Sequence, residues 1–144
     1  MPRMTPVSPS APRTFTHPVR VYYEDTDMAG IVYYAGYLRF LERGRTEWLR
    51  ALGVEQSRLA QEAGIAFAVR SLAIEYLKPA RLDDQLAVLT GLTFCGRAQV
   101  TLEQRIERAG ETLVEARVRV ACLDTRSMKP TALPKEIRTK MGTQ

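Results

Sequence analysis

The stretch YYEDTDMAGIVYYAGYLRFLERGRTEWL, residues 22–49, contains the change of pattern that decides the fold. The residues leading into it, HPVRVYYED, are rich in Val and Tyr and predict a β-strand. From Tyr37 onward, apolar residues recur at the spacing of a helix. Between the two patterns lie two acids, Asp25 and Asp27, and a glycine, Gly30. Acids at such a place are either turn residues or a chemical site held near the positive end of a helix.

The expected long helix has one apolar face and one charged face. Gly44 lies within that apolar face although glycine costs a helix about 1 kcal/mol relative to alanine. We therefore expect the helix to approach its neighbour closely at this point. Gly53 is where the helix should end, a short second helix is expected over residues 54–62, and a short closing helix near the C-terminus. The apolar face of the long helix consists of Tyr37, Phe40, Leu41, Gly44, Trp48, Leu49 and Leu52.

Beyond Gly64 the apolar residues alternate with a period of two, which predicts a series of strands. Short connectors between them indicate antiparallel neighbours with one apolar face and one wet face. The sheet is expected to wrap around the long helix, which gives an α+β fold. The residues expected to share the inner face are Ala66, Ala68, Leu72, Ile74 and Tyr76, then Leu86, Val88, Leu92 and Phe94, then Val100, Leu102 and Ile106, then Val114, Ala116, Val118, Val120 and Cys122.

The 144 residues are enough for one domain, which we expect over residues 17–144. Residues 1–16 are rich in Pro, Ser and Thr and lack the apolar core of a secretory signal, so a disordered tail is expected there. No apolar run approaches the length of a transmembrane segment. Cys95 and Cys122 lack the spacing of a metal site, and a reducing cytoplasm is the expected compartment.

The charge and the histidine content exclude several classes of function. Lys and Arg number 21 against 16 acids, a net charge of +5, but the basic residues are spread along the chain and form no nucleic-acid motif. His17 is the only histidine, which argues against a Ser-His-Asp site and against a zinc site. Catalysis is therefore expected to use carboxylates and backbone dipoles, with no metal or redox cofactor.

Three segments carry a resemblance to a known family: VRVYYEDTDMAGIVYYAGYLRFLERGRTEWL, FAVRSLAIEYLKPARLDD and MKPTALPKEI, which together span most of residues 19–137. The chain resembles the hot-dog-fold acyl-CoA thioesterases of the 4-hydroxybenzoyl-CoA thioesterase type, and most of all the branch associated with the Tol-Pal envelope system. The resemblance implies an antiparallel sheet wrapped around a central helix. It also implies an acyl-CoA substrate, a homodimer that can pair into a homotetramer, and active sites at the subunit interface.

The same resemblance assigns the site residues. The family's catalytic carboxylate is the acid three residues before the glycine, here Asp27, which acts as general base for water or as nucleophile. The backbone N–H of Tyr34, at the start of the helix, would polarise the thioester carbonyl. Gly30 would let the backbone pass close to the substrate, and Tyr33 would line the acyl site. Arg97 would bind a phosphate of coenzyme A, or else is a solvated arginine of the turn.

The chain departs from the branch at Tyr34, where many members carry a histidine. The role of the backbone N–H survives this change, and the tyrosine side chain would instead shape the acyl pocket. Asp25 is expected to be structural. Glu42 and Glu47 are rival candidates, since another class of hot-dog thioesterases places its catalytic glutamate on the central helix, but pairing with nearby arginines is the favoured interpretation.

The sequence therefore predicts a cytoplasmic acyl-CoA thioesterase. Two alternatives stay open. One is a hot-dog protein that binds acyl carrier protein or enzymes of envelope and lipid synthesis, with little hydrolysis. The other is a hydratase or dehydratase, which ranks last because such enzymes usually need a histidine in the site.

Overall fold

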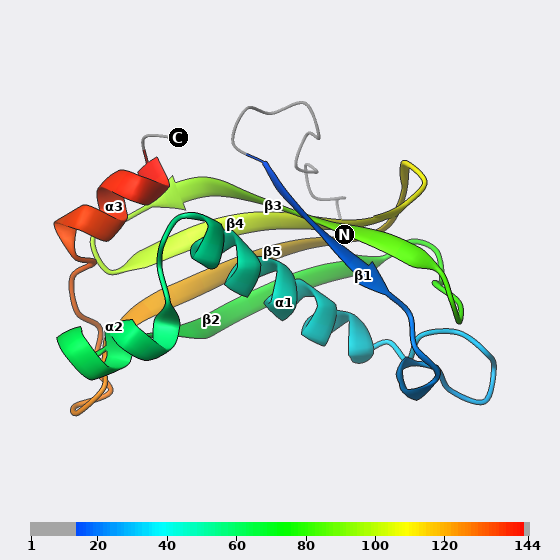
Figure 1. Ribbon diagram of the computed structural model, residues 1–144, viewed down its shortest axis with the longest axis horizontal. Helices are drawn as coiled ribbons and strands as arrows, with labels where there is room; N and C mark the ends of the chain where they lie inside the picture. The colour runs from blue at the N-terminus through cyan, green and yellow to red at the C-terminus, as the bar shows by residue number, and fades with distance from the viewer. Residues whose placement is uncertain (1–13, 143–144) are drawn as a thin grey trace.

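The computed structural model describes residues 14–142 and contains one antiparallel sheet and three α-helices (Figure 1). The sheet has five strands in the order β1-β3-β4-β5-β2, so that β1 and β2 form its two edges. The predicted α+β class is confirmed. The elements are β1 Phe15–Arg20, a 3₁₀ turn Tyr23–Asp25, α1 Gly36–Ala51, α2 Gln56–Ala63, β2 Ile65–Tyr76, β3 Gln85–Cys95, β4 Gln99–Arg108, β5 Glu111–Asp124 and α3 Lys135–Gly142.

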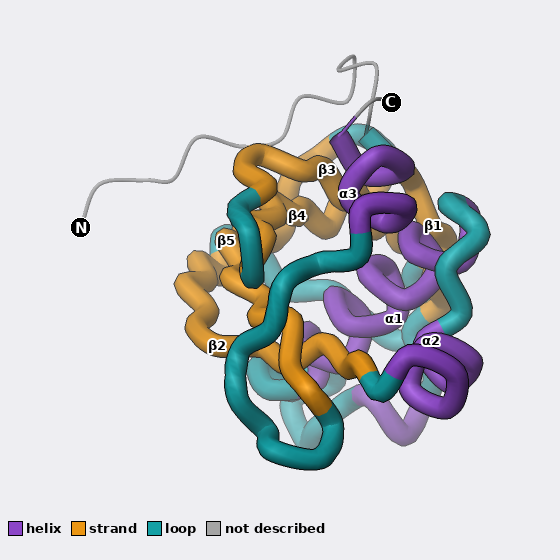
Figure 2. The backbone as a smooth tube through the Cα atoms, turned by 90° about the vertical axis from the view of Figure 1, so that its left-hand side faces the viewer, coloured by secondary structure: helices purple, strands orange, loops and turns teal. Residues whose placement is uncertain are grey.

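Helix α1 lies in the concave face of the curved sheet, as expected. Figure 2, which looks along the molecule from one end, shows the helices on one side of the strands. The buried face of α1 is the one predicted from its spacing, with Phe40 and Leu41 completely covered. It packs against inner-face residues of the sheet such as Ile106 and Val118. Burial of these apolar side chains supplies the main stabilising energy of the fold.

At Gly44 the backbone of α1 comes very close to the sheet. A Cβ atom added to Gly44 would lie 2.5 Å from Cγ1 of Val88 on β3. Beside it, the side-chain amide of Gln104 on β4 donates to the carbonyl oxygen of Leu41 (3.0 Å) and to Oγ1 of Thr90 (2.9 Å). Gln104 is only 1% exposed, so these bonds satisfy a polar group that would otherwise be buried without partners. The expected close approach of the helix is confirmed.

Two β-bulges correct the predicted inner faces. The pairing of β2 with β5 shifts between Val69 and Ser71, so the inner residues before the shift are Phe67 and Val69 and not Ala66 and Ala68. The pairing of β3 with β4 shifts between Leu92 and Phe94. As a result Phe94 faces outward and is 55% exposed. An extra residue in one strand moves every later side chain to the other face, and an even alternation in the sequence does not reveal it.

The outer face of the sheet is less wet than the sequence predicts. Glu103, Arg105 and Glu115 are buried although they alternate with the inner-face residues of their strands. Ion pairs accompany this burial, with Arg117 donating to Glu103 (2.6 Å) and Arg105 lying 2.7 Å from Glu107. The sequence pattern predicted that the outer face of the sheet is solvated. At the centre of that face the structure instead has buried charged side chains that form ion pairs.

The helices and strands begin and end close to where the sequence predicts, except at the start of β1. Strand β1 begins at Phe15, inside the tail expected over residues 1–16, and residues 1–13 of that tail lie outside the described residues. Helix α1 ends just before Gly53, and α2 is capped by Gly64 in the left-handed conformation (φ 65°). The closing helix is present as α3, with Ile137 and Met141 buried.

Replacement of Gly44 by alanine tests the close contact. Alanine raises helix propensity by about 1 kcal/mol, but the added methyl group would overlap Val88, whose branched side chain is stiff. We expect Gly44→Ala to lower the free energy of unfolding by about 1–3 kcal/mol, measured by denaturant titration. Gly142→Ala is the control, because a Cβ atom there meets nothing within 4 Å. Equal stability of Gly44→Ala and the wild type would contradict the contact.

Candidate active site

Asp27 opens a tight turn between the 3₁₀ turn and α1. Its backbone N–H donates to the carbonyl oxygen of Ile31 (2.9 Å), and the N–H of Gly30 donates to the carbonyl oxygen of Asp27 (3.0 Å). Gly30 has a positive φ of 78°, which a residue with a side chain adopts only with strain. A Cβ atom at Gly30 would meet nothing within 4 Å, so the turn geometry explains the glycine within one protomer.

The two acids of the turn have different environments. Asp25 is 5% exposed, and its carboxylate accepts from the backbone N–H of Tyr22 (2.8 Å) and lies 3.6 Å from the guanidinium of Arg39. Asp27 is exposed, and the N–H of Ala29 donates to its Oδ1 (2.9 Å). Asp25 is therefore a structural acid, as predicted. Among residues 14–142 no hydrogen bond or ion pair is made by the second carboxylate oxygen of Asp27.

The start of α1 presents backbone donors beside this turn. Among the described residues no hydrogen bond is made by the backbone N–H of Tyr34 or of Ala35, whereas those of Tyr33 and Gly36 are both engaged. Unpaired N–H groups at the first turn of a helix carry partial positive charge that the helix dipole reinforces. Such groups can stabilise an oxygen that gains negative charge during a reaction.

Asp27 and Tyr34 border the same groove, which has a volume of about 450 Å³. Tyr33, Tyr34, Tyr37 and Tyr76 line it together with Asp27. The rings of Tyr33 and Tyr34 lie 4.7 Å apart, and that of Tyr76 lies 6.2 Å from Tyr34 and 5.7 Å from Tyr37. The structure thus brings Asp27, Tyr33 and Tyr34 together. Gly30 shapes the turn but does not line the groove.

The buried hydroxyl of Tyr37 links the groove to the chain that follows β2. Burial raises the pKa of Tyr37, and the negative charges of Asp84 and Asp27 act in the same direction. The backbone N–H of Ala80 donates to this hydroxyl (2.9 Å), and the carbonyl oxygen of Ala80 accepts from the N–H of Val32 (2.9 Å). One residue of the β2–β3 connection therefore holds both the first turn of α1 and the end of the Asp27 turn.

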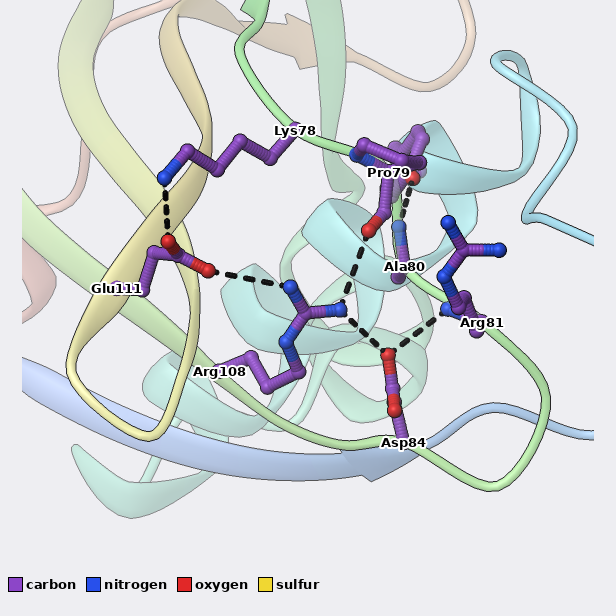
Figure 3. Close-up of polar contacts among 8 residues, drawn as sticks. Lys78, Pro79, Ala80, Arg81, Asp84, Arg108 and Glu111 are labelled. Atoms are coloured by element: carbon purple, nitrogen blue, oxygen red, sulfur yellow. Dashed lines mark hydrogen bonds and ion pairs between the residues drawn. The ribbon is translucent and has the colours of Figure 1, made fainter.

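A network of charged residues holds this connection on its other side (Figure 3). The guanidinium of Arg108 donates to Asp84 Oδ2 (2.8 Å), to the carbonyl oxygen of Pro79 (3.2 Å) and to Glu111 Oε1 (3.1 Å). Burial alone would raise the pKa of Asp84, but the hydrogen bonds from the Arg81 N–H and from Arg108 outweigh burial and lower it.

Arg97 does not join Asp27 within one protomer. It follows the C-terminal end of β3, whereas the groove lies beside the connection that leads into the N-terminal end of β3. Its carbonyl oxygen accepts from the N–H of Leu133 (2.8 Å), which lies shortly before α3 in the chain. The predicted phosphate ligand is therefore separated from Asp27 by the length of an eleven-residue strand.

Glu42 and Glu47 lie elsewhere on α1. Glu47 pairs with Arg50, as predicted. Glu42 accepts from the hydroxyl of Thr46 (3.1 Å) and lines a second cavity of about 250 Å³ with Arg45, Trp48, Phe67 and Val69. For Glu42 the structure shows no ion pair with an arginine among the described residues, so the expected pairing is not observed there. Glu42 therefore stays a rival candidate in a cavity of its own.

The sequence analysis missed Tyr76 and Ala80 as neighbours of Asp27. Tyr76 is the last residue of β2, and Ala80 acts through its backbone, which no side-chain motif records. Ala80 lies in the segment KPARLDD, which carries part of the resemblance to the thioesterases. This segment is the sequence signal that points to the region around Ala80. Within residues 14–142 no group of three or more His, Cys, Asp or Glu side chains is arranged to hold a metal ion. No helix in that range is long and apolar enough to cross a membrane.

Known proteins share both the sequence and the fold. Residues 21–141 match the thioesterase-like superfamily. The acyl-CoA thioesterase YbgC of Haemophilus influenzae is 50% identical over 124 residues, which cover 86% of this chain and 91% of the relative. The acyl-CoA thioester hydrolase YbgC of Escherichia coli is also 50% identical, over 85% of this chain and 92% of the relative.

Two solved structures have the same architecture. A probable thioesterase from Bartonella henselae superposes with a TM-score of 0.80 at 36% identity, over 84% of this chain and 99% of the other. A 1,4-dihydroxy-2-naphthoyl-CoA thioesterase from Synechocystis superposes with a TM-score of 0.82 at 25% identity, over 89% and 95%. The predicted hot-dog fold is confirmed, and the chain belongs to the thioesterase-like superfamily, in the family of the YbgC acyl-CoA thioesterases.

Proposed function

We propose that this protein hydrolyses the thioester of an acyl-CoA to a free acid and coenzyme A, with Asp27 as the catalytic carboxylate. The observation that supports this most directly is the shared groove. The exposed carboxylate of Asp27 borders one aromatic groove with Tyr34, whose backbone N–H has no partner among the described residues. The names of the relatives agree with the reaction class.

Each part of the groove has a chemical task in this proposal. The carbonyl oxygen of the thioester accepts from the backbone N–H of Tyr34, which draws electron density from the carbonyl carbon. Asp27 then removes a proton from an attacking water, or attacks the carbonyl itself and forms a mixed anhydride that water opens. In both routes the C–S bond breaks, and the thiolate of coenzyme A leaves and takes up a proton.

The acyl group is proposed to lie on the tyrosines. Tyr33 and Tyr34 are both exposed, and together with Tyr76 they give the groove an aromatic floor next to Asp27. Gly30 would leave room above the turn for the substrate. Because Arg97 is remote from Asp27 in one protomer, its proposed contact with a coenzyme A phosphate requires the Arg97 of a second protomer.

A homodimer is proposed to form through β2. This strand is twelve residues long, one of its edges is unpaired within the described chain, and its inner face exposes apolar side chains, among them Val69 (50%) and Tyr76 (44%). Such an edge normally pairs or is protected. An antiparallel pairing across a two-fold axis would bring the end of β2 that carries Val69 beside the partner's end that carries Tyr76. Pairing of two dimers into a tetramer is a further proposal.

The cellular setting is also proposed from the resemblance. A cytoplasmic location fits two free cysteines, one of them buried. The segments that resemble the Tol-Pal-associated branch favour a role connected with the envelope system. Acyl carrier protein in place of coenzyme A as the carrier of the acyl group is a separate possibility that a substrate panel distinguishes.

Steady-state hydrolysis of a panel of aliphatic and aromatic acyl-CoAs, with matching acyl carrier protein thioesters, tests the proposed reaction. We expect turnover of at least one thioester, and a loss of about 10²-fold or more in kcat for Asp27→Asn, which keeps the shape of the side chain but not its basicity. Glu42→Gln is the matched control and should retain activity. Loss in Glu42→Gln with retention in Asp27→Asn would move the site to the second cavity. No turnover of any thioester, with tight capture of a carrier protein, would favour the binding module.

The stability of the two acid variants shows that the loss is chemical. Asp27→Asn should unfold within about 0.5 kcal/mol of the wild type, because the side chain is exposed. Asp25→Ala should lose about 1–3 kcal/mol, because it leaves the N–H of Tyr22 without its acceptor. A large loss of stability in Asp27→Asn would make its kinetic defect uninformative about the acid's role and would place Asp27 among the structural turn residues.

Sedimentation velocity at micromolar concentration tests the dimer. We expect the wild type to have the mass of a dimer or tetramer, and Val69→Lys to shift toward the monomer because a charge on the inner face of β2 would be buried at the pairing. Val69→Thr, which has a similar shape and no charge, is the control and should stay oligomeric. A monomeric wild type would contradict the pairing through β2.

A further inference from the structure

The connection between β2 and β3, residues 77–84, forms a wall of the Asp27 groove. Leu77, Lys78 and Pro79 line the groove itself. Ala80 is completely buried and makes two backbone hydrogen bonds, donating to Tyr37 and accepting from Val32. An isolated bridge between Ile31 and Arg81 extends this contact along the Asp27 turn. The position of the turn relative to α1 therefore depends on where this connection lies.

The guanidinium of Arg108 joins both ends of the same connection, which backbone hydrogen bonds to Val21 and Leu113 and the side chain of Arg20 also hold. Figure 3 shows Arg108, the last residue of β4, in the centre of the network, with Pro79 and Asp84 on one side and Glu111 on the other. Its NH1 donates to both the carbonyl oxygen of Pro79 and the carboxylate of Asp84, and its NH2 donates to Glu111. Asp84 accepts in addition from the backbone N–H of Arg81 (2.8 Å). Glu111 also pairs with Lys78, which borders the groove.

A guanidinium suits this position better than an ammonium group does. It presents several N–H donors in a fixed plane, so it can reach two carboxylates and a carbonyl oxygen that lie in different directions. A lysine at the same position is a single flexible point of charge. Arg108 thereby ties the β2–β3 connection at two points, Pro79 and Asp84, that flank Ala80 in the chain.

We propose that Arg108 is a positioning residue for the reaction: by holding Pro79 and Asp84 it fixes Ala80, and through Ala80 it sets the Asp27 turn against the backbone donors at the start of α1. The inference rests on the proposed function of Asp27. Arg108 acts through the backbone of residues 79–84. Its removal lets the turn and the helix start move relative to each other, and a displacement of about 1 Å between reacting groups lowers a rate by roughly 10²-fold.

The position of the network distinguishes it from ordinary surface ion pairs. The side chains of Arg108 and Asp84 are 30% and 22% exposed, so solvent screens them only in part. Removal of Arg108 is therefore expected to lower the stability as well as the rate, and the two effects are separated by measuring kcat on folded protein.

The experiment compares Arg108→Met and Arg108→Lys with Arg117→Met in the acyl-CoA hydrolysis assay. Arg117 is the matched control, because it also pairs with a glutamate on the sheet, Glu103 (2.6 Å), but touches no residue of the groove or of the β2–β3 connection. For each variant kcat and KM are measured separately, and the unfolding midpoint is recorded so that kcat refers to folded protein.

We expect kcat of Arg108→Met to fall by about 10- to 100-fold with KM changed by less than about threefold, because substrate still binds but the reacting groups are misplaced. Arg108→Lys should recover part of kcat, and Arg117→Met should keep the wild-type kcat. Unchanged kcat in folded Arg108→Met would overturn the proposal. An equal loss in Arg117→Met would also overturn it, since the effect would then be one of general stability.

A double-mutant cycle with Tyr37→Phe tests the route through Ala80. Tyr37→Phe removes the hydroxyl to which the N–H of Ala80 donates. If Arg108 and Tyr37 act on the same segment, the decrease in kcat of the double variant is smaller than the product of the two single decreases. Independent, multiplicative effects would overturn the route.

Failure of this inference differs visibly from failure of the proposed function. If Asp27→Asn abolishes hydrolysis while Arg108→Met leaves kcat unchanged, only the role of Arg108 is wrong. If Asp27→Asn retains hydrolysis, the proposed function of Asp27 is wrong, and Arg108 then has no acid to position.

Discussion

The close contact of α1 with the sheet at Gly44 is the constraint on which the rest of the structure depends. A glycine in mid-helix lets the backbone approach β3, and the buried amide of Gln104 joins the helix to β4 through the carbonyl oxygen of Leu41. The apolar face of α1 supplies burial energy, but burial is not directional. The glycine and the amide select the depth and the rotation at which the helix packs.

That fixed helix gives the Asp27 groove its geometry. The start of α1 presents the N–H groups of Tyr34 and Ala35, and the turn before it presents the carboxylate of Asp27. Neither part is held by α1 alone. Asp25 anchors the 3₁₀ turn that precedes Asp27, and Ala80 anchors the end of the turn. A small exposed site is thus supported by buried contacts that come from three separate parts of the chain.

The individual site residues differ in how far sequence could predict them. Asp27, Gly30 and Tyr34 lie within one local motif, so their neighbourhood follows from the turn between strand and helix. Arg97 differs from these residues, because its strand carries it to the other end of the sheet within one protomer, so its predicted role depends on a second protomer. The segment KPARLDD pointed to the region of Ala80, but its contacts could not be predicted because they are made by the backbone. Those of Arg108 could not be predicted because they join residues distant in sequence.

The sequence by itself determined the α+β class, the apolar face of α1, the four alternating strands after Gly64 and the place of the acid turn. These features depend on local periodicity and on turn chemistry, which the chain records residue by residue. Only the tertiary structure decided which face Phe67, Val69 and Phe94 occupy, because a bulge arises from the pairing of two strands. It alone also decided that Ala80 joins Tyr37 to the Asp27 turn and that Arg108 bonds to Pro79 and Asp84 on either side of Ala80. Contacts between residues distant in sequence exist only once the sheet has formed around the helix.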